Sequence, residues 1–105
     1  MTKTYNKLVR DNIPAIIQAK GAVCETEILS DADCLRLLDA KLAEELTEYQ
    51  QDQNIEELAD LMEVIYACAK ARGYTVAELE SVRAEKAAKR GGFARKILLK
   101  TVTED

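Results

Sequence analysis

The chain has 105 residues, of which 48% are apolar and 32% are charged, and its formal net charge is −4. This length predicts one domain over residues 1–105. The acidic balance argues against a nucleic-acid polymer as partner, because such a partner needs a large basic surface, and no apolar run is long enough to make a membrane a partner.

The absence of histidine and the odd number of cysteines limit the catalytic mechanisms and metal sites that this chain can form. The chain has no histidine, which removes Ser-His-Asp and Cys-His nucleophilic mechanisms and the usual zinc sites. Cys24, Cys34 and Cys68 are odd in number and lack metal-binding spacing. With no recognisable signal peptide, we expect a cytoplasmic protein with reduced thiols, two of them buried.

The first thirty residues predict an arm, a short helix and a connection. The first eleven residues interleave cations with apolar side chains, which is typical of an extended arm docked on the protein. Asp11 and Asn12 offer helix caps, Pro14 suits a first helical turn, and Gly21 ends the helix. Residues 22–29 could form a loop or a short extended piece.

Capping patterns introduce the longer helices. Ser30 and Thr75 are each followed three positions later by an acidic residue, which is the pattern of a helix N-terminus. Three long helices are expected, over residues 31–51, 55–72 and 76–89.

The end of the chain predicts an irregular segment. Two glycines, Gly91 and Gly92, break the chain after the last helix. Residues 94–102 have the residue types of a short strand or an extended tail, and residues 103–105 are expected to fray.

The helix expected over residues 55–72 is apolar over about half its circumference, which is wider than one neighbouring helix can cover. Packing against a second copy of the chain is the simplest way to bury it. The sequence therefore predicts an all-α fold, a small antiparallel bundle of about four helices with a short extended C-terminal segment, completed as a homodimer or homotetramer.

Acidic residues flank the turn expected at residues 52–54. If the two helices fold antiparallel about this turn, Glu48 comes level with Glu57, and Glu45 comes level with Asp60. The two members on each helix are three residues apart and therefore share a face. Four carboxylates are thus predicted to converge on one point.

Such a cluster needs positive charge. Two like charges about 5 Å apart repel by about 3 kcal/mol at an effective dielectric near 20, and no lysine or arginine lies between Lys41 and Lys70 in the sequence. A divalent cation would offset the repulsion, and all-oxygen ligands favour Mg²⁺ or Mn²⁺. Without a metal, the same residues read as a solvated acidic face, with Glu57 as the partner of a helix cap begun by Asn54.

Basic residues surround the glycines near the C-terminus. Glycine lets a backbone approach an anion closely, and flanking cations bind phosphate; the alternative is an ordinary basic helix end followed by a glycine stop. The cations of this segment are Lys86, Lys89, Arg90, Arg95 and Lys96.

These motifs together resemble the all-α nucleotide pyrophosphohydrolase superfamily, which includes MazG-like enzymes, phosphoribosyl-ATP pyrophosphohydrolase and dimeric dUTPases. The superfamily motif, Glu-Glu-x-x-Glu followed by Glu-x-x-Asp, matches residues 44–48 and 57–60. The segments Tyr-Asn-Lys-Leu-Val-Arg-Asp-Asn-Ile-Pro at 5–14 and Arg-Gly-Gly-Phe at 90–93 resemble a small single-domain branch labelled phosphoribosyl-ATP pyrophosphohydrolase-like. The resemblance spans nearly the whole chain.

The resemblance implies a hydrolase that uses Mg²⁺, with Mn²⁺ as a substitute, to cleave the α–β phosphoanhydride of a nucleotide to monophosphate and pyrophosphate. In the matching positions Glu44 would orient or deprotonate water, or serve as an extra ligand. The metal would be held by Glu45, Glu48, Glu57 and Asp60. Phosphate contacts are expected from Lys7, Arg10, Lys89, Arg90 and Arg95.

Two other classes of function fit the same residues. One is a non-catalytic helical module that binds nucleotide or assembles into oligomers, and the other is a simple divalent-ion binder. The base and sugar of a nucleotide substrate stay open, since Tyr49, Tyr66 and Phe93 could stack on a base or lie in a core.

Overall fold

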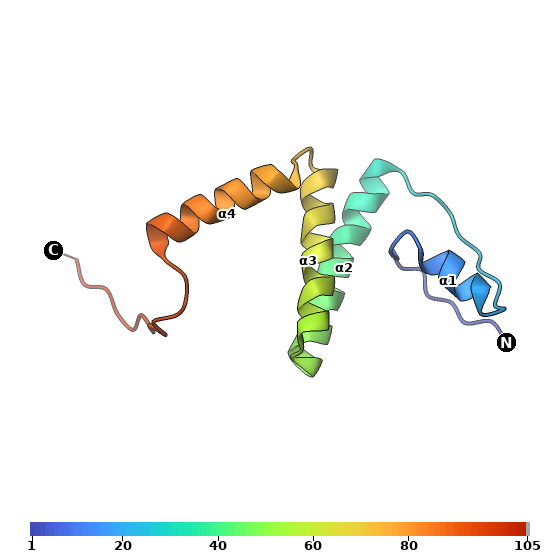
Figure 1. Cartoon of the computed structure of the whole chain (residues 1–105), viewed down its shortest axis with the longest axis horizontal. Coiled ribbons are helices and arrows are strands. Elements are labelled where there is room, and N and C mark those ends of the chain that lie inside the picture. The colour runs from blue at the N-terminus through green and yellow to red at the C-terminus, as the bar shows by residue number, and fades with distance from the viewer. Residues whose placement is uncertain (105) are drawn as a thin grey trace. The chain divides into compact units, whose positions relative to one another are not determined.

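The computed structural model describes residues 1–104, which form four helices and no strand (Figure 1). The all-α prediction is confirmed, and the three long helices begin and end within one residue of their predicted bounds. Within these described residues no helix has the length and apolar character needed to cross a membrane. Asp105, predicted to fray, lies outside the described residues. The helices are α1 (Ile13–Ala19), α2 (Asp31–Asp52), α3 (Ile55–Ala71) and α4 (Val76–Arg90).

The chain divides into two compact units. The first unit, Met1–Tyr74, holds an N-terminal arm, α1, α2 and α3. The second unit begins at Thr75 and holds α4 and the tail that follows it. The single domain expected over residues 1–105 stays a prediction.

An antiparallel hairpin of α2 and α3 forms the body of the first unit (Figure 1). Leu38 of α2 and Val64 of α3 are the buried apolar residues of this hairpin, at 6% and 8% exposure. Glu45 is as deeply buried as they are, at 6%. The small core therefore includes a carboxylate.

The connection between α2 and α3 consists of Gln53 and Asn54. Gln53 adopts a left-handed conformation, with φ 53° and ψ 36°, and its backbone N–H donates to the carbonyl of Tyr49. The Asn54 side chain then accepts a hydrogen bond of 2.9 Å from the backbone N–H of Glu57. These two local features hold the turn in the tight form that the sequence predicted.

The start of the chain departs from one predicted cap. Asn12 stands at the N-cap of α1, but its side chain makes no capping hydrogen bond. Its backbone is already helical, with φ −89° and ψ −4°, whereas a capping side chain requires an extended backbone. Pro14 does lie in the first turn, and residues 22–29 form an irregular connection.

The other predicted helix caps are confirmed. Ser30 accepts from the backbone N–H of Asp33, and Thr75 forms a reciprocal capping box with Glu78. The tail after α4 contains no strand in its described part, residues 91–104.

The expectation that two thiols are buried is wrong. All three are half-buried and form no disulfide, because the small core buries Leu38 and Val64 and does not extend to them; they are Cys24, Cys34 and Cys68.

Replacing Gln53 by glycine should stabilise the hairpin. A left-handed residue after a helix is strained for any side chain and relaxed for glycine, so the Gln53→Gly free energy of unfolding should rise by about 0.5–1 kcal/mol. Urea denaturation followed by circular dichroism measures this change.

The matched control is Gln51→Gly, two positions earlier and inside α2. Gln51 lies in the last turn with a helical backbone, where glycine costs up to about 1 kcal/mol, so this variant should lose stability. Equal effects of the two substitutions would contradict the left-handed turn.

Candidate metal centre

The hairpin brings together acidic residues that lie on different helices. One carboxylate oxygen from each of Glu45, Glu57 and Asp60 lies within 4.8 Å of the others. Glu45 belongs to α2, while Glu57 and Asp60 are three residues apart on α3. Three of the four carboxylates predicted to converge thus come together across the two helices, while Glu48 is not part of this group.

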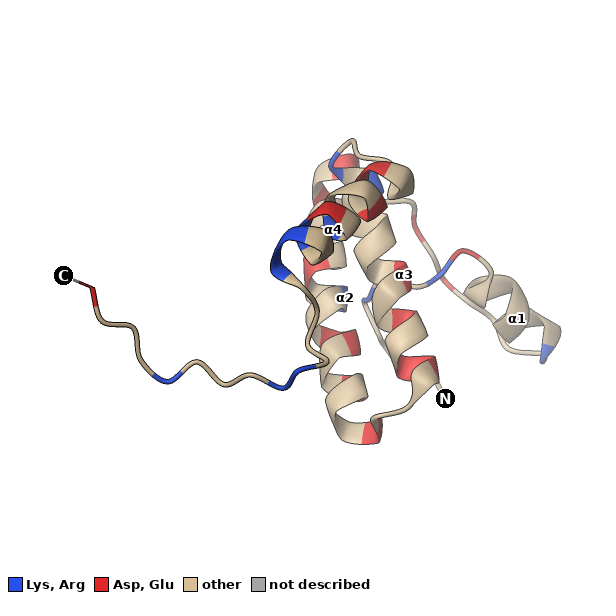
Figure 2. Ribbon diagram, turned by 60° about the vertical axis from the view of Figure 1, so that its left-hand side comes forward, with Lys and Arg blue, Asp and Glu red and all other residues tan. Residues whose placement is uncertain are grey.

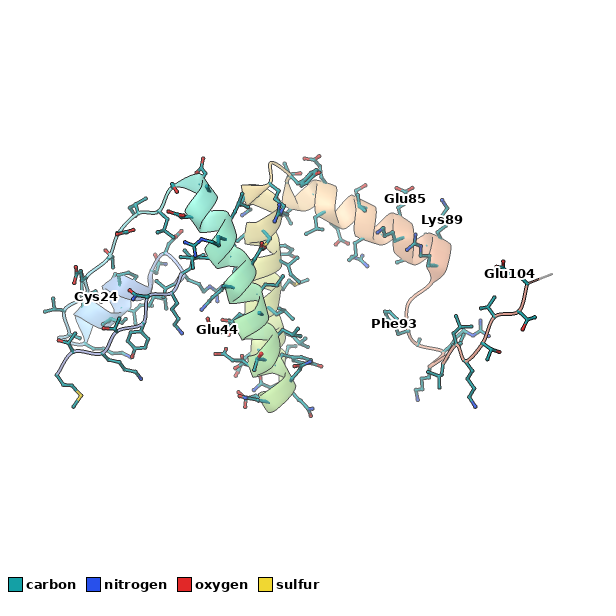
Figure 3. All side chains as sticks on the ribbon, turned by 180° about the vertical axis from the view of Figure 1, so that it is seen from behind. Cys24, Glu44, Glu85, Lys89, Phe93 and Glu104 are labelled. Atoms are coloured by element: carbon teal, nitrogen blue, oxygen red, sulfur yellow. The ribbon has the colours of Figure 1, made fainter. Side chains whose placement is uncertain are left out.

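A second group overlaps the first on α2. Glu44, Glu45 and Glu48 also offer three oxygens within 4.8 Å of one another. Glu45 is common to both groups, so the five carboxylates form one set of two overlapping groups. Figure 2 shows acidic residues on both helices of the hairpin, and Figure 3 labels Glu44 on α2. We call this set the acidic cluster; its members are Glu44, Glu45, Glu48, Glu57 and Asp60.

The oxygen spacing suits a small divalent cation. Oxygens bound to one Mg²⁺ at about 2.1 Å lie at most about 4.2 Å apart. Within each group of three residues the offered oxygens lie within 4.8 Å of one another, a limit that is slightly larger. A small rotation of the side chains would therefore close the group around an ion.

Two buried oxygens of the cluster have no hydrogen-bond partner. They are Oε2 of Glu45 and Oε2 of Glu57. A buried carboxylate oxygen without a partner is costly, and a metal ion is one group that satisfies it. The Asn54 cap uses only the backbone N–H of Glu57, so the cap explains the start of α3 and leaves this carboxylate unpaired.

The pKa values of the same two residues report this environment. Burial, followed by the neighbouring carboxylate of Glu48, raises the pKa of Glu45. Burial also raises the pKa of Glu57, together with the negative charges of Asp52, Asp60 and Glu45. In both cases the folded protein disfavours the ionised form, as expected for carboxylates gathered without sufficient counter-charge.

The structure nevertheless supplies cations that the sequence analysis missed. Nζ of Lys41 lies 3.5 Å from Glu44 and 3.3 Å from Glu45. The expectation that no local cation offsets the cluster is therefore wrong. Lysine three and four positions before two glutamates is a recognisable helix pattern, and this spacing could have identified the contact.

The N-terminal arm provides two further cations. Lys7 donates a 2.9 Å hydrogen bond to Glu44, and Arg10 donates one of 3.2 Å to Asp60. The Lys7 hydrogen bond lowers the pKa of Glu44 and raises that of Lys7. These residues were predicted to bind phosphate, whereas here they bind carboxylates.

A count of charges shows what the cluster still lacks. The five carboxylates of the acidic cluster contribute five negative charges when ionised. Lys7, Arg10 and Lys41 contribute three positive charges. Five minus three leaves two negative charges that these cations do not offset.

The remaining predicted phosphate ligands belong to the second unit. Lys89 and Arg90 lie in the last turn of α4, where basic residues gather, and Arg95 follows in the tail (Figure 2). All three are exposed, and none forms an ion pair within residues 75–104. Lys89 and Arg90 help line a shallow hollow of about 210 Å³ on α4.

The aromatic candidates differ in exposure. Tyr49 and Tyr66 are half-buried on the hairpin helices, whereas Phe93 in the tail is 97% exposed (Figure 3). Phe93 is thus the aromatic side chain of the three that has no core role within its own unit.

Comparison of the chain with protein-family models, curated proteins and solved structures finds no match. The superfamily resemblance therefore stays a prediction that rests on the motifs themselves.

Replacing Glu57 by glutamine tests the cluster as a metal centre. A raised carboxylate pKa means that the folded state loses stability as pH rises from the unfolded pKa through the folded one. Without metal, Glu57→Gln should therefore melt at a higher temperature than the wild type at pH 7, and this difference should vanish below about pH 4.

With saturating Mg²⁺ the wild type should melt at a higher temperature than Glu57→Gln. Mg²⁺ at about 100 times its dissociation constant should stabilise the wild type by about 2.7 kcal/mol, and Glu57→Gln should lose most of this gain. The control, Glu56→Gln, removes an exposed carboxylate from the preceding position and should keep it. A destabilised Glu57→Gln variant with an intact Mg²⁺ response would contradict the metal centre.

Proposed function

We propose that the protein is a Mg²⁺-dependent nucleotide pyrophosphohydrolase that cleaves the α–β phosphoanhydride of a nucleoside triphosphate or related nucleotide. The observation that carries the metal half of this proposal is the pair of unpartnered buried oxygens, Glu45 Oε2 and Glu57 Oε2, in a five-carboxylate cluster. The reaction itself is taken from the resemblance to the MazG-like superfamily.

The donor set favours the proposed cofactor. Oxygen ligands alone suit Mg²⁺ or Mn²⁺ rather than zinc, and Glu45, Glu48, Glu57 and Asp60 would hold the ion. When bound, such an ion neutralises phosphate charge and lowers the pKa of a water molecule. Three free thiols fit a reducing, cytoplasmic setting for this activity.

Glu44 is the residue proposed to act on water. Its carboxylate lies beside the other members of the cluster, and the Lys7 hydrogen bond keeps it ionised by lowering its pKa. As the water oxygen bonds to phosphorus and the α–β bridge breaks, Glu44 would accept the water proton, and pyrophosphate would leave. No covalent enzyme intermediate is needed, so the absence of histidine is no obstacle.

One observation favours a non-catalytic nucleotide-binding module instead. Glu44 is paired with both Lys7 and Lys41, and a carboxylate with a lowered pKa is a weak base. A protein that keeps these pairs while nucleotide is bound would hold its ligand without hydrolysing it.

Pyrophosphate release from a panel of nucleoside triphosphates, with and without Mg²⁺, separates these functions. Glu57→Gln and Asp60→Asn should each reduce Mg²⁺-dependent release by about 100-fold or more, because each removes a metal ligand. Glu56→Gln serves again as the control and should be fully active.

Each competing function has its own signature in this assay. Nucleotide binding without pyrophosphate production identifies the non-catalytic module, and Mn²⁺ binding with no nucleotide dependence identifies a simple ion binder. Unchanged turnover in both ligand variants would reject the proposed site.

The proposed assembly is a homodimer or homotetramer built on α3. An exposed apolar stripe runs along this helix at spacings of three, four and three residues, which is the pattern of a helix seam. Its members are Ile55, Leu58, Met62 and Ile65, which are 79%, 45%, 50% and 39% exposed, respectively.

A charge placed in the stripe should break the assembly. Met62→Lys should shift light scattering at micromolar concentration from oligomer to monomer, because a buried lysine without a partner is costly. Glu56→Lys adds a positive charge on the same helix outside the stripe and should stay oligomeric. A wild-type protein that is already a monodisperse monomer would contradict this assembly.

A further inference from the structure

The N-terminal arm, residues 1–12, is held to the hairpin mainly by charge. The arm precedes α1 and has no helix or strand. Leu8 is its one half-buried side chain, and the others are exposed. A hollow of about 80 Å³ lies between the arm and α2 and is lined in part by Lys7 and Glu44.

The arm's two ion-pairing residues reach both helices of the hairpin. Lys7 pairs with Glu44 of α2 at 2.9 Å. Arg10 pairs with Asp60 of α3 at 3.2 Å and lies 3.6 Å from Glu63. Glu44 and Asp60 are members of the acidic cluster, so the arm spans the cluster and attaches to it from both sides.

Arg10 and a metal ion need the same carboxylate. Arg10 donates to Oδ1 of Asp60, and Asp60 is one of three residues whose oxygens converge within 4.8 Å. A divalent cation held by the Asp60 carboxylate would repel the guanidinium bound to the same carboxylate, and it would draw away the negative charge that strengthens their hydrogen bond. Binding of one therefore disfavours binding of the other.

We propose that the N-terminal arm is a latch on the metal centre: Arg10 and Lys7 neutralise the acidic cluster when no metal is bound, and a divalent cation displaces Arg10 and releases the arm. This inference rests on the metal centre of the proposed function. It assigns to Arg10 and Lys7 a second role, because a released arm presents both cations for contact with phosphate.

The strength of the contacts suits a reversible latch. The ion pairs of the arm are solvent-exposed, with Arg10 at 59% and Asp60 at 41% side-chain exposure. Exposed pairs contribute little individually, so an ion at the cluster can displace them. The coupling is reciprocal: whatever the metal does to the arm, loss of the arm contact does to metal affinity by the same factor.

Metal titration without nucleotide tests the latch. In calorimetry with Mn²⁺ and Mg²⁺, Arg10→Gln should bind metal about two- to fivefold more tightly than the wild type, as expected when exposed ion pairs stop competing. Arg10→Lys, which keeps the charge, should stay close to the wild type. Lys3→Gln is the matched control, because it removes a charge from the same arm at a residue that forms no ion pair within residues 1–104.

Hydrogen exchange of the arm provides the second readout. Saturation with Mg²⁺ should speed amide exchange in residues 1–12 of the wild type, whereas in Arg10→Gln the exchange should be fast from the start and insensitive to metal. If Arg10 acted only as a fixed positive charge near the site, Arg10→Gln would change metal affinity, but Mg²⁺ would not change amide exchange in the wild-type arm.

The outcomes separate this inference from the proposed enzyme. Unchanged exchange in the arm on metal binding, equal metal affinity in Arg10→Gln and the wild type, or no metal binding by either protein would overturn the latch. Tight metal binding with the expected arm release, but no pyrophosphate from any nucleotide, would support the latch and count against the hydrolase alone.

Discussion

Repulsion among the carboxylates at the α2/α3 interface is the unfavourable interaction that the surrounding residues of the first unit partly offset. Glu45 occupies a position as buried as the apolar residues Leu38 and Val64, and Glu57 faces it from the other helix. In a hairpin selected for stability alone, apolar side chains of similar size would serve better at these positions. The placement of acidic groups in so small a core is therefore a feature that folding does not require and that the proposed binding of a cation would explain.

The surrounding sequence limits the cost of this arrangement without removing it. Lys41 reaches Glu44 and Glu45 from the preceding turn of α2, and Lys7 and Arg10 reach the cluster from the arm. All three cations are attached by flexible side chains, and two of them stand on a segment with almost no apolar anchoring. Lys7 and Arg10 are exposed, whereas the Lys41–Glu45 pair is largely buried, at 14% and 8% side-chain exposure. None of the three cations reaches Oε2 of Glu45 or Oε2 of Glu57, which are left without a partner.

Local patterns in the sequence predicted the helices and the acidic register because each depends on neighbouring residues. The caps at Ser30 and Thr75 and the turn after Asp52 fix where the helices begin and end, and the turn then fixes which carboxylates face each other. The arm contacts could not be predicted in this way, because Lys7 and Glu44 lie 37 positions apart and no periodicity links them. The cap predicted at Asn12 fails because the backbone of this residue is already helical, which residue type alone does not reveal.

Charge balance also bears on the proposed reaction. Without metal, Lys7, Arg10 and Lys41 offset three of the five negative charges of the acidic cluster. A divalent ion that displaces the arm would leave three positive charges, two from the ion and one from Lys41, against the same five carboxylates, and a polyphosphate adds several negative charges of its own. Lys7 and Arg10, released from Glu44 and Asp60, are cations of the first unit that could then contact the phosphates. Release of the arm would thus redirect the same two charges from carboxylates to substrate.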